Sequence, residues 1–319
     1  MAIREGRSVA VEIPDSEPTT IEAVLLQELE ELDPQEQRVL CGFLKRIKRN
    51  RVVKGQMDEL AVVVNGLKDY PTEDEWLSSE KVNEKTAPDL HKEFVWAEKI
   101  QLETKLPPIA ESISEVINSR TSVRDFKRTA LSLEKLSALL NHSCGVRDTI
   151  AAYNRRDITL RNFPTPGGLQ CSEFYLVANE VEDIPQGLYH YSSTQNYLEL
   201  LERGNFRWRV VNCCSQHEWL AEASVVIFIA SDVSRLTWKY GAYSSYRLAH
   251  LETGVVGQNL HLVATALELG SSMVFGFDDE DTDSLLGLDG LQEFTTLLVA
   301  VGDKIDKNSL LQKFTDRNR

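Results

Sequence analysis

The chain has 319 residues, of which 42% are hydrophobic and 26% are charged. This length and apolar content suit one large or two medium globular domains with a sizeable core. The formal net charge of −14 argues against a protein that mainly holds nucleic acid, because phosphate binding needs a concentrated basic surface. The acidity favours solubility, and a docking surface for a basic partner is the alternative.

Thiol and targeting signals indicate a cytoplasmic protein. No apolar run approaches the roughly 18–20 residues of a membrane span, and the N-terminal stretch lacks the apolar core of a signal peptide. The odd number of cysteines shows no CxxC spacing, which indicates reduced thiols. The histidines are scattered without a Cys or carboxylate at ligand spacing, so we expect no metal site.

Residues 1–105 are predicted to form an N-terminal helical region with a docking or dimerisation role. Thr20 is a candidate N-cap for one helix, and Asp33-Pro34 begins a second with apolar residues on one face. Residues 57–67 fit either helix or strand. The polar stretch over residues 68–92 reads as a connector, and we place the domain boundary at residue 105.

From residue 106 onward the patterns predict an α+β domain. We expect a short helix over residues 112–119 and a second helix that begins after Ser132 and ends before Gly145. The stretches SEFYLVANEV and GLYHYSSTQNYLELL read as strands around a turn. ASVVIFIAS is apolar throughout, which predicts a central strand.

A long buried helix and a closing strand complete this domain. The helix is expected over residues 244–270, with apolar residues around most of its circumference and Gly270 as its stop. EFTTLLVAVGD predicts the last strand. Helices that flank a mostly antiparallel or mixed sheet define the fold class as α+β.

The stretch INSRTSVRDF contains a candidate phosphate site. Arg120, Ser122 and Arg124 place two guanidiniums and a hydroxyl within five residues. Arginine binds a dianionic phosphate bidentately and does not titrate, so the group suits that ligand. The alternative is a solvated charge pair with Asp125.

Two glycine-containing stretches are candidates for contact with a flat ligand. In RNFPTPGGLQ, the prolines stiffen the chain and the glycines allow close backbone approach. In the Phe275-Gly276-Phe277 stretch, backbone N–H groups could donate to a ring nitrogen or carbonyl. The alternatives are an ordinary turn and plain entry to a strand.

The Trp238-Lys239-Tyr240-Gly241 stretch places an amine beside a phenol. Neighbouring side chains diverge in helices and strands, so this pair reaches one site only from irregular backbone, which Gly241 permits. A nearby ammonium would lower the tyrosine pKa from about 10 and make Tyr240 a usable base. The alternative is a surface lysine next to a packing tyrosine.

The order of these stretches resembles the nitroreductase superfamily and, within it, the SagB-type dehydrogenases, flavin enzymes that oxidise azolines in ribosomally made peptides. QGLYHY and DDEDTDSLLGLDG are particularly similar to that branch. The resemblance covers roughly residues 110–305. It implies FMN at a homodimer interface and an FMN-binding domain over residues 106–319.

The resemblance also implies roles for single residues. An arginine–serine group and a basic residue after the last strand would bind the phosphate, a Pro-Thr turn would lie along the flavin, and a backbone stretch would face its N5 and O4 region. Thr165 and Pro166 depart from the usual serine and small residue, but a hydroxyl is kept at Thr165. The implied cofactor-binding positions are Arg120, Ser122, Arg124, Pro164, Thr165, Gly167, Phe275, Gly276 and Lys304, and Lys239 and Tyr240 match the Lys-Tyr pair thought catalytic in the branch.

The expected reaction converts thiazoline or oxazoline rings of a precursor peptide to azoles. Tyr240 would take the Cα proton, Lys239 would hold down its pKa, flavin N5 would accept a hydride, and O₂ would reoxidise the flavin. A cyclodehydratase is a candidate partner, and neither nucleic acid nor membrane is expected. Two alternatives remain open: an NAD(P)H-dependent nitroreductase-type enzyme acting on small aromatics, and a non-catalytic docking subunit of a peptide-modifying complex.

Overall fold

The computed structural model describes residues 86–214 and 217–305. The two helices expected before residue 50, the ambiguous stretch 57–67 and most of the polar connector lie outside these residues. The division of the chain at residue 105 and the role of its first part therefore stay predictions.

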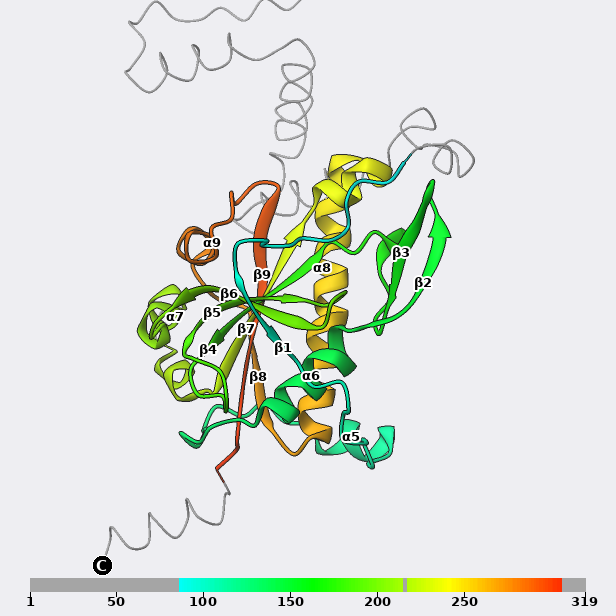
Figure 1. The fold of residues 1–319 in the computed structure, drawn as a ribbon. Helices are drawn as coiled ribbons and strands as arrows, with labels where there is room; N and C mark the ends of the chain where they lie inside the picture. The colour runs from blue at the N-terminus through cyan, green and yellow to red at the C-terminus, as the bar shows by residue number, and fades with distance from the viewer. Residues whose placement is uncertain (1–85, 215–216, 306–319) are drawn as a thin grey trace, which may run out of the picture. The chain divides into compact units, whose positions relative to one another are not determined.

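The described part is built on a seven-stranded sheet in the order β1-β6-β5-β4-β7-β9-β8 (Figure 1). All pairings between these strands are antiparallel, which confirms the expected α+β fold. The strands are β1 (Glu98–Gln101), β4 (Ser172–Ala178), β5 (Gly187–Ser192), β6 (Tyr197–Arg203), β7 (Val225–Asp232), β8 (Gly270–Val274) and β9 (Glu293–Gly302).

Helices cover both faces of this sheet. Along β7, Val225, Ile227 and Ile229 belong to one hydrophobic cluster, and the alternating residues Val226 and Phe228 belong to a second. Because both faces are buried, β7 is the central strand that its unbroken apolar sequence predicted. One face is covered by α6 (Leu133–Cys144) and α8 (Ser234–Ala266), and the other by α7 (Arg207–Cys213), the 3₁₀ helix η2 (Glu218–Glu222) and α9 (Asp279–Leu286).

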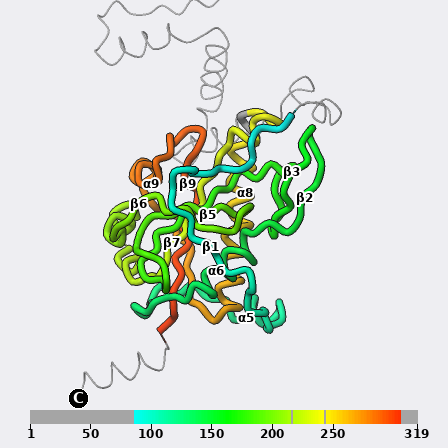
Figure 2. Tube along the Cα trace, in the orientation of Figure 1, coloured from blue at the N-terminus to red at the C-terminus, as the bar shows by residue number. Residues whose placement is uncertain are grey.

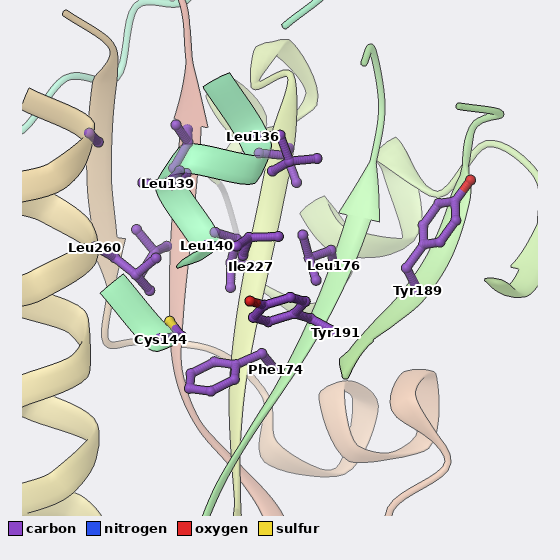
Figure 3. Packing of buried hydrophobic residues seen from close by; sticks show 14 of the residues in the cluster. Leu136, Leu139, Leu140, Cys144, Phe174, Leu176, Tyr189, Tyr191, Ile227 and Leu260 are labelled. Carbon is purple, nitrogen blue, oxygen red and sulfur yellow. The ribbon is translucent and has the colours of Figure 1, made fainter. Parts of the chain in front are cut away.

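The cluster beneath α6 and α8 is packed from both helices and the sheet. Figure 3 shows Leu136 and Leu140 of α6 beside Leu176 and Ile227 of the sheet, with Leu260 of α8 at the side. All of them are fully buried, and complete burial of one such side chain is worth about 1.5–3 kcal/mol. This packing fixes α8 across the sheet and so determines where its two ends lie.

The caps of the short helices follow the sequence. Ser132 precedes α6 and accepts a hydrogen bond from the Lys135 N–H at 3.2 Å, and Gly145 is the C-cap. The helix α5 (Ile113–Ser119) begins after Ser112, whose hydroxyl and backbone form a capping box with Glu115. These boundaries confirm the predicted helices.

The bounds of the long helix differ from the prediction. It extends over Ser234–Ala266 but is broken at Gly241, so the continuous part begins close to the expected residue 244. It ends at Ala266, so Gly270 is not its stop. The chain turns at Glu268, which has φ 61°, and Gly270 is the first residue of β8. A Cβ at Gly270 would lie 2.8 Å from the Val123 side chain, so tight packing, not helix termination, requires glycine there.

A hairpin of β2 (Val146–Ala152) and β3 (Arg155–Arg161) stands apart from the main sheet (Figure 1). The hairpin was not predicted, because its charged residues interrupt the apolar alternation of a half-buried strand. An extended segment before β1 joins the hairpin to the sheet edge (Figure 2). The Ala87 N–H donates to the Tyr153 carbonyl at 3.1 Å, and the Phe94 N–H donates to Glu199 Oε1 at 3.0 Å.

Within the described ranges, none of the helices combines the length and the apolar character needed to cross a bilayer. Among the same residues, no group of three or more His, Cys, Asp or Glu side chains is arranged to hold a metal ion.

Candidate functional site

Lys239 and Tyr240 lie directly before a break in α8. The break is at Gly241, whose φ of 69° and ψ of 165° glycine adopts without steric strain. The two side chains converge on Gly167, since a Cβ at that position would lie 2.7 Å from Tyr240 Oη and 3.3 Å from Lys239 Nζ. The irregular backbone and the shared location of the pair therefore agree with the sequence prediction.

Gly167 belongs to the short 3₁₀ turn η1 (Pro166–Gly168) and has a φ of 62°. Its missing side chain leaves the space that Tyr240 and Lys239 occupy. This glycine was expected to allow close approach of a flat ligand. In the structure the close approach is made by the two side chains of α8.

Tyr153 is a third member of this cluster and was not predicted. Lys239 Nζ donates to Tyr153 Oη at 2.9 Å, and that hydroxyl donates to the Gly167 carbonyl at 2.8 Å. Tyr153 also packs edge-on against Trp238. It lies in the turn of the β2–β3 hairpin, more than 80 residues before Lys239 in the chain, so no local motif indicated the contact.

The charges at this cluster correct one expectation. Burial raises the pKa of Tyr240; the ammonium of Lys239 opposes this rise without cancelling it, and Tyr153 adds to it. The expected lowering of the Tyr240 pKa is therefore wrong for the isolated chain. Burial acts to lower the pKa of Lys239, but the hydrogen bond to Tyr153 and the two nearby phenols outweigh it and raise that pKa. At neutral pH Lys239 is therefore an ammonium and Tyr240 a neutral phenol.

Arg120 lies at the opposite end of α8. It is the C-cap of α5, and its Nη1 donates to His261 Nε2 at 2.9 Å. His261 Nδ1 in turn contacts Ser271 Oγ of β8 at 2.5 Å. Burial, followed by the positive charge of Arg120, lowers the pKa of His261 to about 4. The imidazole is therefore neutral at pH 7 and orients the guanidinium as a hydrogen-bond acceptor.

Ser122 and Lys304 lie at this same end. Ser122 forms a parallel bridge with Ser271, and Phe126 forms an antiparallel bridge with Lys304. The segment from Arg120 to Lys127 thus crosses the start of β8 and the end of β9. The backbone therefore brings Ser122 and Lys304 to the same end of the sheet from two distant parts of the sequence.

Arg124 follows along the same segment but faces a different neighbour. Its guanidinium carbon lies 5.9 Å from the centre of the Trp219 ring. The charge pair with Asp125, considered as an alternative, is absent among the described residues, where no carboxylate lies within 4 Å of Arg120, Arg124 or Lys304. Cations without carboxylate partners fit a phosphate ligand.

The remaining predicted positions are open to solvent. Phe275 is 77% exposed directly after β8, and a Cβ at Gly276 would meet no atom within 4 Å. Pro164 and Thr165 line a cavity of about 400 Å³ beside the C-terminal end of β3. None of these four residues belongs to a hydrophobic core cluster.

The predicted site residues therefore form two groups in one chain. Lys239, Tyr240 and Gly167 are at the N-terminal end of α8, and Arg120 with its neighbours is at the C-terminal end. The helix from Gly241 to His261 is about 30 Å long at 1.5 Å of rise per residue. Figure 1 shows α5 near one end of α8 and the hairpin beside the other.

Comparison with known families identifies the fold that carries these groups. A sequence model described as the nitroreductase family matches residues 117–303, which is more than half of the chain. The chain belongs to the nitroreductase family. The matched range includes both ends of α8 and every predicted site residue except Lys304.

Two relatives are similar in sequence. The nitroreductase MJ1384 of Methanocaldococcus jannaschii is 29% identical over 206 residues, which cover 64% of this chain and 98% of that protein. The trifolitoxin-processing protein TfxB of Rhizobium leguminosarum bv. trifolii is 27% identical over 172 residues, or 50% of this chain. That match spans only 44% of TfxB.

Two solved structures share the fold. A nitroreductase from Anabaena variabilis superposes with a TM-score of 0.55 and 26% identity over 66% of this chain and 42% of that one. A chain of the E. coli microcin synthetase McbBCD complex, solved with truncated pro-MccB17 bound, gives a TM-score of 0.52 over 88% of this chain and 98% of that one. Its 19% identity establishes the fold alone.

Proposed function

We propose that the protein is a SagB-type, FMN-dependent dehydrogenase that oxidises thiazoline or oxazoline rings of a precursor peptide to azoles. The convergence of Lys239 and Tyr240 on Gly167 carries this proposal, because that turn is where family resemblance expects the flavin. The sequence similarity to TfxB, a trifolitoxin-processing protein, also supports a role in peptide modification. A cyclodehydratase partner belongs to the same proposal.

The residues present fit FMN. Arg120, Ser122 and Lys304 would hold the phosphate, joined by Arg124, since no carboxylate competes for these cations in the described part of the chain. Pro164, Thr165 and Gly167 would lie along the ring system, and the exposed backbone at Phe275 and Gly276 would face its polar edge. Neutral His261 supports the phosphate end by orienting Arg120.

One FMN needs both groups, and a single chain separates them by about 30 Å along α8. We therefore infer a homodimer in which one copy supplies the phosphate-binding end and its partner supplies the Lys-Tyr end. Exposed apolar residues on α5 and α8 support an interface there. Ile113 is 67% exposed, Ile117 55% and Leu251 60%.

The reaction removes a proton and a hydride from adjacent ring carbons, which makes the bond between them double. Bound FMN supplies the two-electron acceptor for the hydride. Tyr240 accepts the Cα proton and passes it to solvent, and the Lys239 ammonium favours the phenolate over the phenol. Because the Tyr240 pKa is raised, the phenolate is the minor form at neutral pH, and the rate should increase with pH until that pKa is reached.

The test is mass spectrometry of a heterocyclised peptide before and after incubation with the protein. Each ring oxidised loses two hydrogens, about 2 Da. Loss of a general base slows a reaction about 10²–10⁴-fold, so we expect that decrease for Tyr240→Phe with FMN retained. Tyr197→Phe, which removes a hydroxyl bonded to Glu93 at the sheet edge, is the matched control. A Tyr240→Phe rate within twofold of wild type rules out this role.

The second candidate is an NAD(P)H-dependent nitroreductase-type enzyme acting on small aromatics. It is favoured by the match to MJ1384, which extends over nearly the whole of that protein. This enzyme would keep the fold and FMN but would not need the Lys-Tyr pair. Stopped-flow reduction of the flavin by NADPH, compared with reduction by a thiazoline peptide, separates the two.

A further inference from the structure

Arg161, the last residue of β3, is a buried cation that forms no ion pair within 4 Å among the described residues, although the charges of Glu173 and Glu252 act on it at longer range. Its side chain is held by neutral acceptors: Nε donates to Gln170 Oε1 at 2.7 Å, and Nη1 donates to Ser193 Oγ and more weakly to the Cys144 carbonyl. The residue is only 8% exposed. Within residues 86–214 and 217–305, no carboxylate lies within 4 Å of this guanidinium and Nη2 has no hydrogen-bond partner.

Arg161 lines the cavity of about 400 Å³ beside the C-terminal end of β3, which Pro164 and Thr165 also line. Arg147 of the paired strand β2 lines the same cavity, close to the Val146–Arg161 pair of the ladder. Thr159 and Thr165 add hydroxyl groups, and none of the described residues that line the cavity is an aspartate or glutamate. Two arginines therefore face one cavity on a chain whose net charge is −14.

A guanidinium removed from water is unfavourable unless an opposite charge or a full set of acceptors compensates it. The acceptors around Arg161 leave one of its nitrogens free. Its planar donors match the two oxygens of a carboxylate, and a second arginine strengthens that preference. The cavity is thus built to receive an anionic group from outside the chain.

The position of the cavity indicates which molecule carries this group. Pro164, Thr165 and Gly168 line it, and Gly167 between them contacts Lys239 and Tyr240. Adjacent Cα atoms are about 3.8 Å apart, so a group in the cavity lies close to the proposed reaction centre. Among the strands that the structure describes, β2 pairs only with β3, which leaves its outer edge available to an extended peptide.

We propose that this cavity binds a carboxylate of the peptide substrate, either an acidic side chain or the C-terminus, next to the ring that is oxidised. The proposal rests on the proposed function and adds a substrate class to it: peptides with a negative charge beside the azoline. A dinucleotide phosphate is the competing occupant, and the experiment below separates the two.

The experiment measures binding of dye-labelled, thiazole-containing peptides to the FMN-loaded full chain by fluorescence anisotropy. Four peptides combine Glu or Gln beside the ring with a free or amidated C-terminus, which distinguishes the two carboxylate sources. We expect Arg147→Gln and Arg161→Gln to weaken binding of the acidic peptides about ten- to hundredfold, the value of one charge-assisted hydrogen bond. Neutral peptides should be unaffected.

Arg156→Gln is the matched control, because Arg156 is exposed on β3 and does not line the cavity. FMN content is measured by absorbance for every variant and should not change. Arg161 also supports Gln170 and the Cys144 carbonyl, so if Arg161→Gln does not fold, the exposed Arg147→Gln decides the question.

Three results would overturn the proposal. These are equal losses for acidic and neutral peptides, loss of NADPH binding in Arg147→Gln without loss of peptide binding, or loss of FMN in that variant. Because binding is measured without turnover, charge-dependent binding with no azole formed would contradict the proposed reaction and leave the carboxylate site intact.

Discussion

The two ends of α8 are built differently. At the N-terminal end, Lys239 and Tyr240 are already in contact with Gly167 and Tyr153 within one chain. At the C-terminal end, Arg120 is oriented by His261 but has no anionic partner in the described residues. The side chains at the N-terminal end already contact one another within the chain, whereas the C-terminal end presents cations without an anionic partner among the described residues.

Under the proposed dimer, this one long helix would serve two half-sites. The helix is rigid across its packed core, so its ends cannot approach one another within a chain. A C2 dimer places the same surface of both copies in contact, which can bring unlike ends together in two equivalent sites. The following changes test each end separately.

The largest effect is expected at the phosphate-binding end. Arg120→Gln removes a charge-assisted hydrogen bond, worth about 1.5–3 kcal/mol, so the FMN dissociation constant should rise about ten- to hundredfold. Quenching of flavin fluorescence on binding measures the constant. Arg128→Gln, an exposed arginine paired with Glu222, is the control. If Arg120→Gln leaves the FMN dissociation constant unchanged, the phosphate does not bind at this end of α8.

At the other end, glycine is required at two positions for different reasons. Gly241→Ala would put a Cβ at φ 69° and ψ 165°, a backbone region essentially confined to glycine, which costs about 1–3 kcal/mol, while the Cβ itself would meet no described atom within 4 Å. Gly167→Ala adds left-handed strain of about 1–2 kcal/mol and, in addition, a contact of 2.7 Å with Tyr240 Oη, so its loss of unfolding free energy should exceed the strain alone. Urea denaturation of both variants measures the losses, and a Gly167→Ala loss no larger than left-handed strain would show that Tyr240 does not occupy that space.

A smaller effect is expected from Tyr153→Phe. This change removes a hydrogen bond that raises the pKa of Lys239 and a phenol that raises the pKa of Tyr240. Both pKa values should fall, so the pH–rate profile should shift toward lower pH while FMN stays bound. If the pH–rate profile of Tyr153→Phe does not shift, Tyr153 supports only the fold, whatever the change in the maximal rate.

The smallest effect concerns stability away from both ends. His190 is buried between Glu173 and Glu199, at 3.0 and 2.8 Å. Burial acts to lower its pKa, but the hydrogen bonds and charges of the two glutamates raise it overall. A raised pKa stabilises the fold below the unfolded value of about 6.5, and this contribution is lost as pH rises through the folded pKa.

Thermal unfolding of His190→Gln against wild type measures that contribution. The difference in Tm should be greatest below pH 6.5 and should shrink at alkaline pH. Burial acts to raise the pKa of Glu173, but Arg235 and His190 hold it at about 2, so its charge does not change over this range. A Tm difference that grows with pH would contradict the sign assigned to His190.

The sequence predicted many of the strands and helices and the irregular backbone at Lys239 and Tyr240. Unbroken apolar residues identified β7, caps located α6, and the glycine after Tyr240 indicated the irregular backbone. The hairpin and Tyr153 were missed, because a long-range contact between two polar segments leaves no periodic signal.

Two other features could not be derived from local sequence. The sign of the Tyr240 pKa shift depends on burial, which outweighs the neighbouring ammonium and is visible only in three dimensions. The placement of Lys239 and Tyr240 depends on the helical stretch from Ser234 to the break at Gly241, which the sequence did not indicate as part of α8.

Coexpression of two inactive variants tests the central claim most directly. When Arg120→Gln and Tyr240→Phe chains are mixed equally, half of the dimers contain one copy of each, and one of their two sites has both functional halves. The account predicts recovery of about a quarter of wild-type azole formation, although each variant alone is nearly inactive. A mixture no more active than the two variants measured separately would contradict a site shared between two copies.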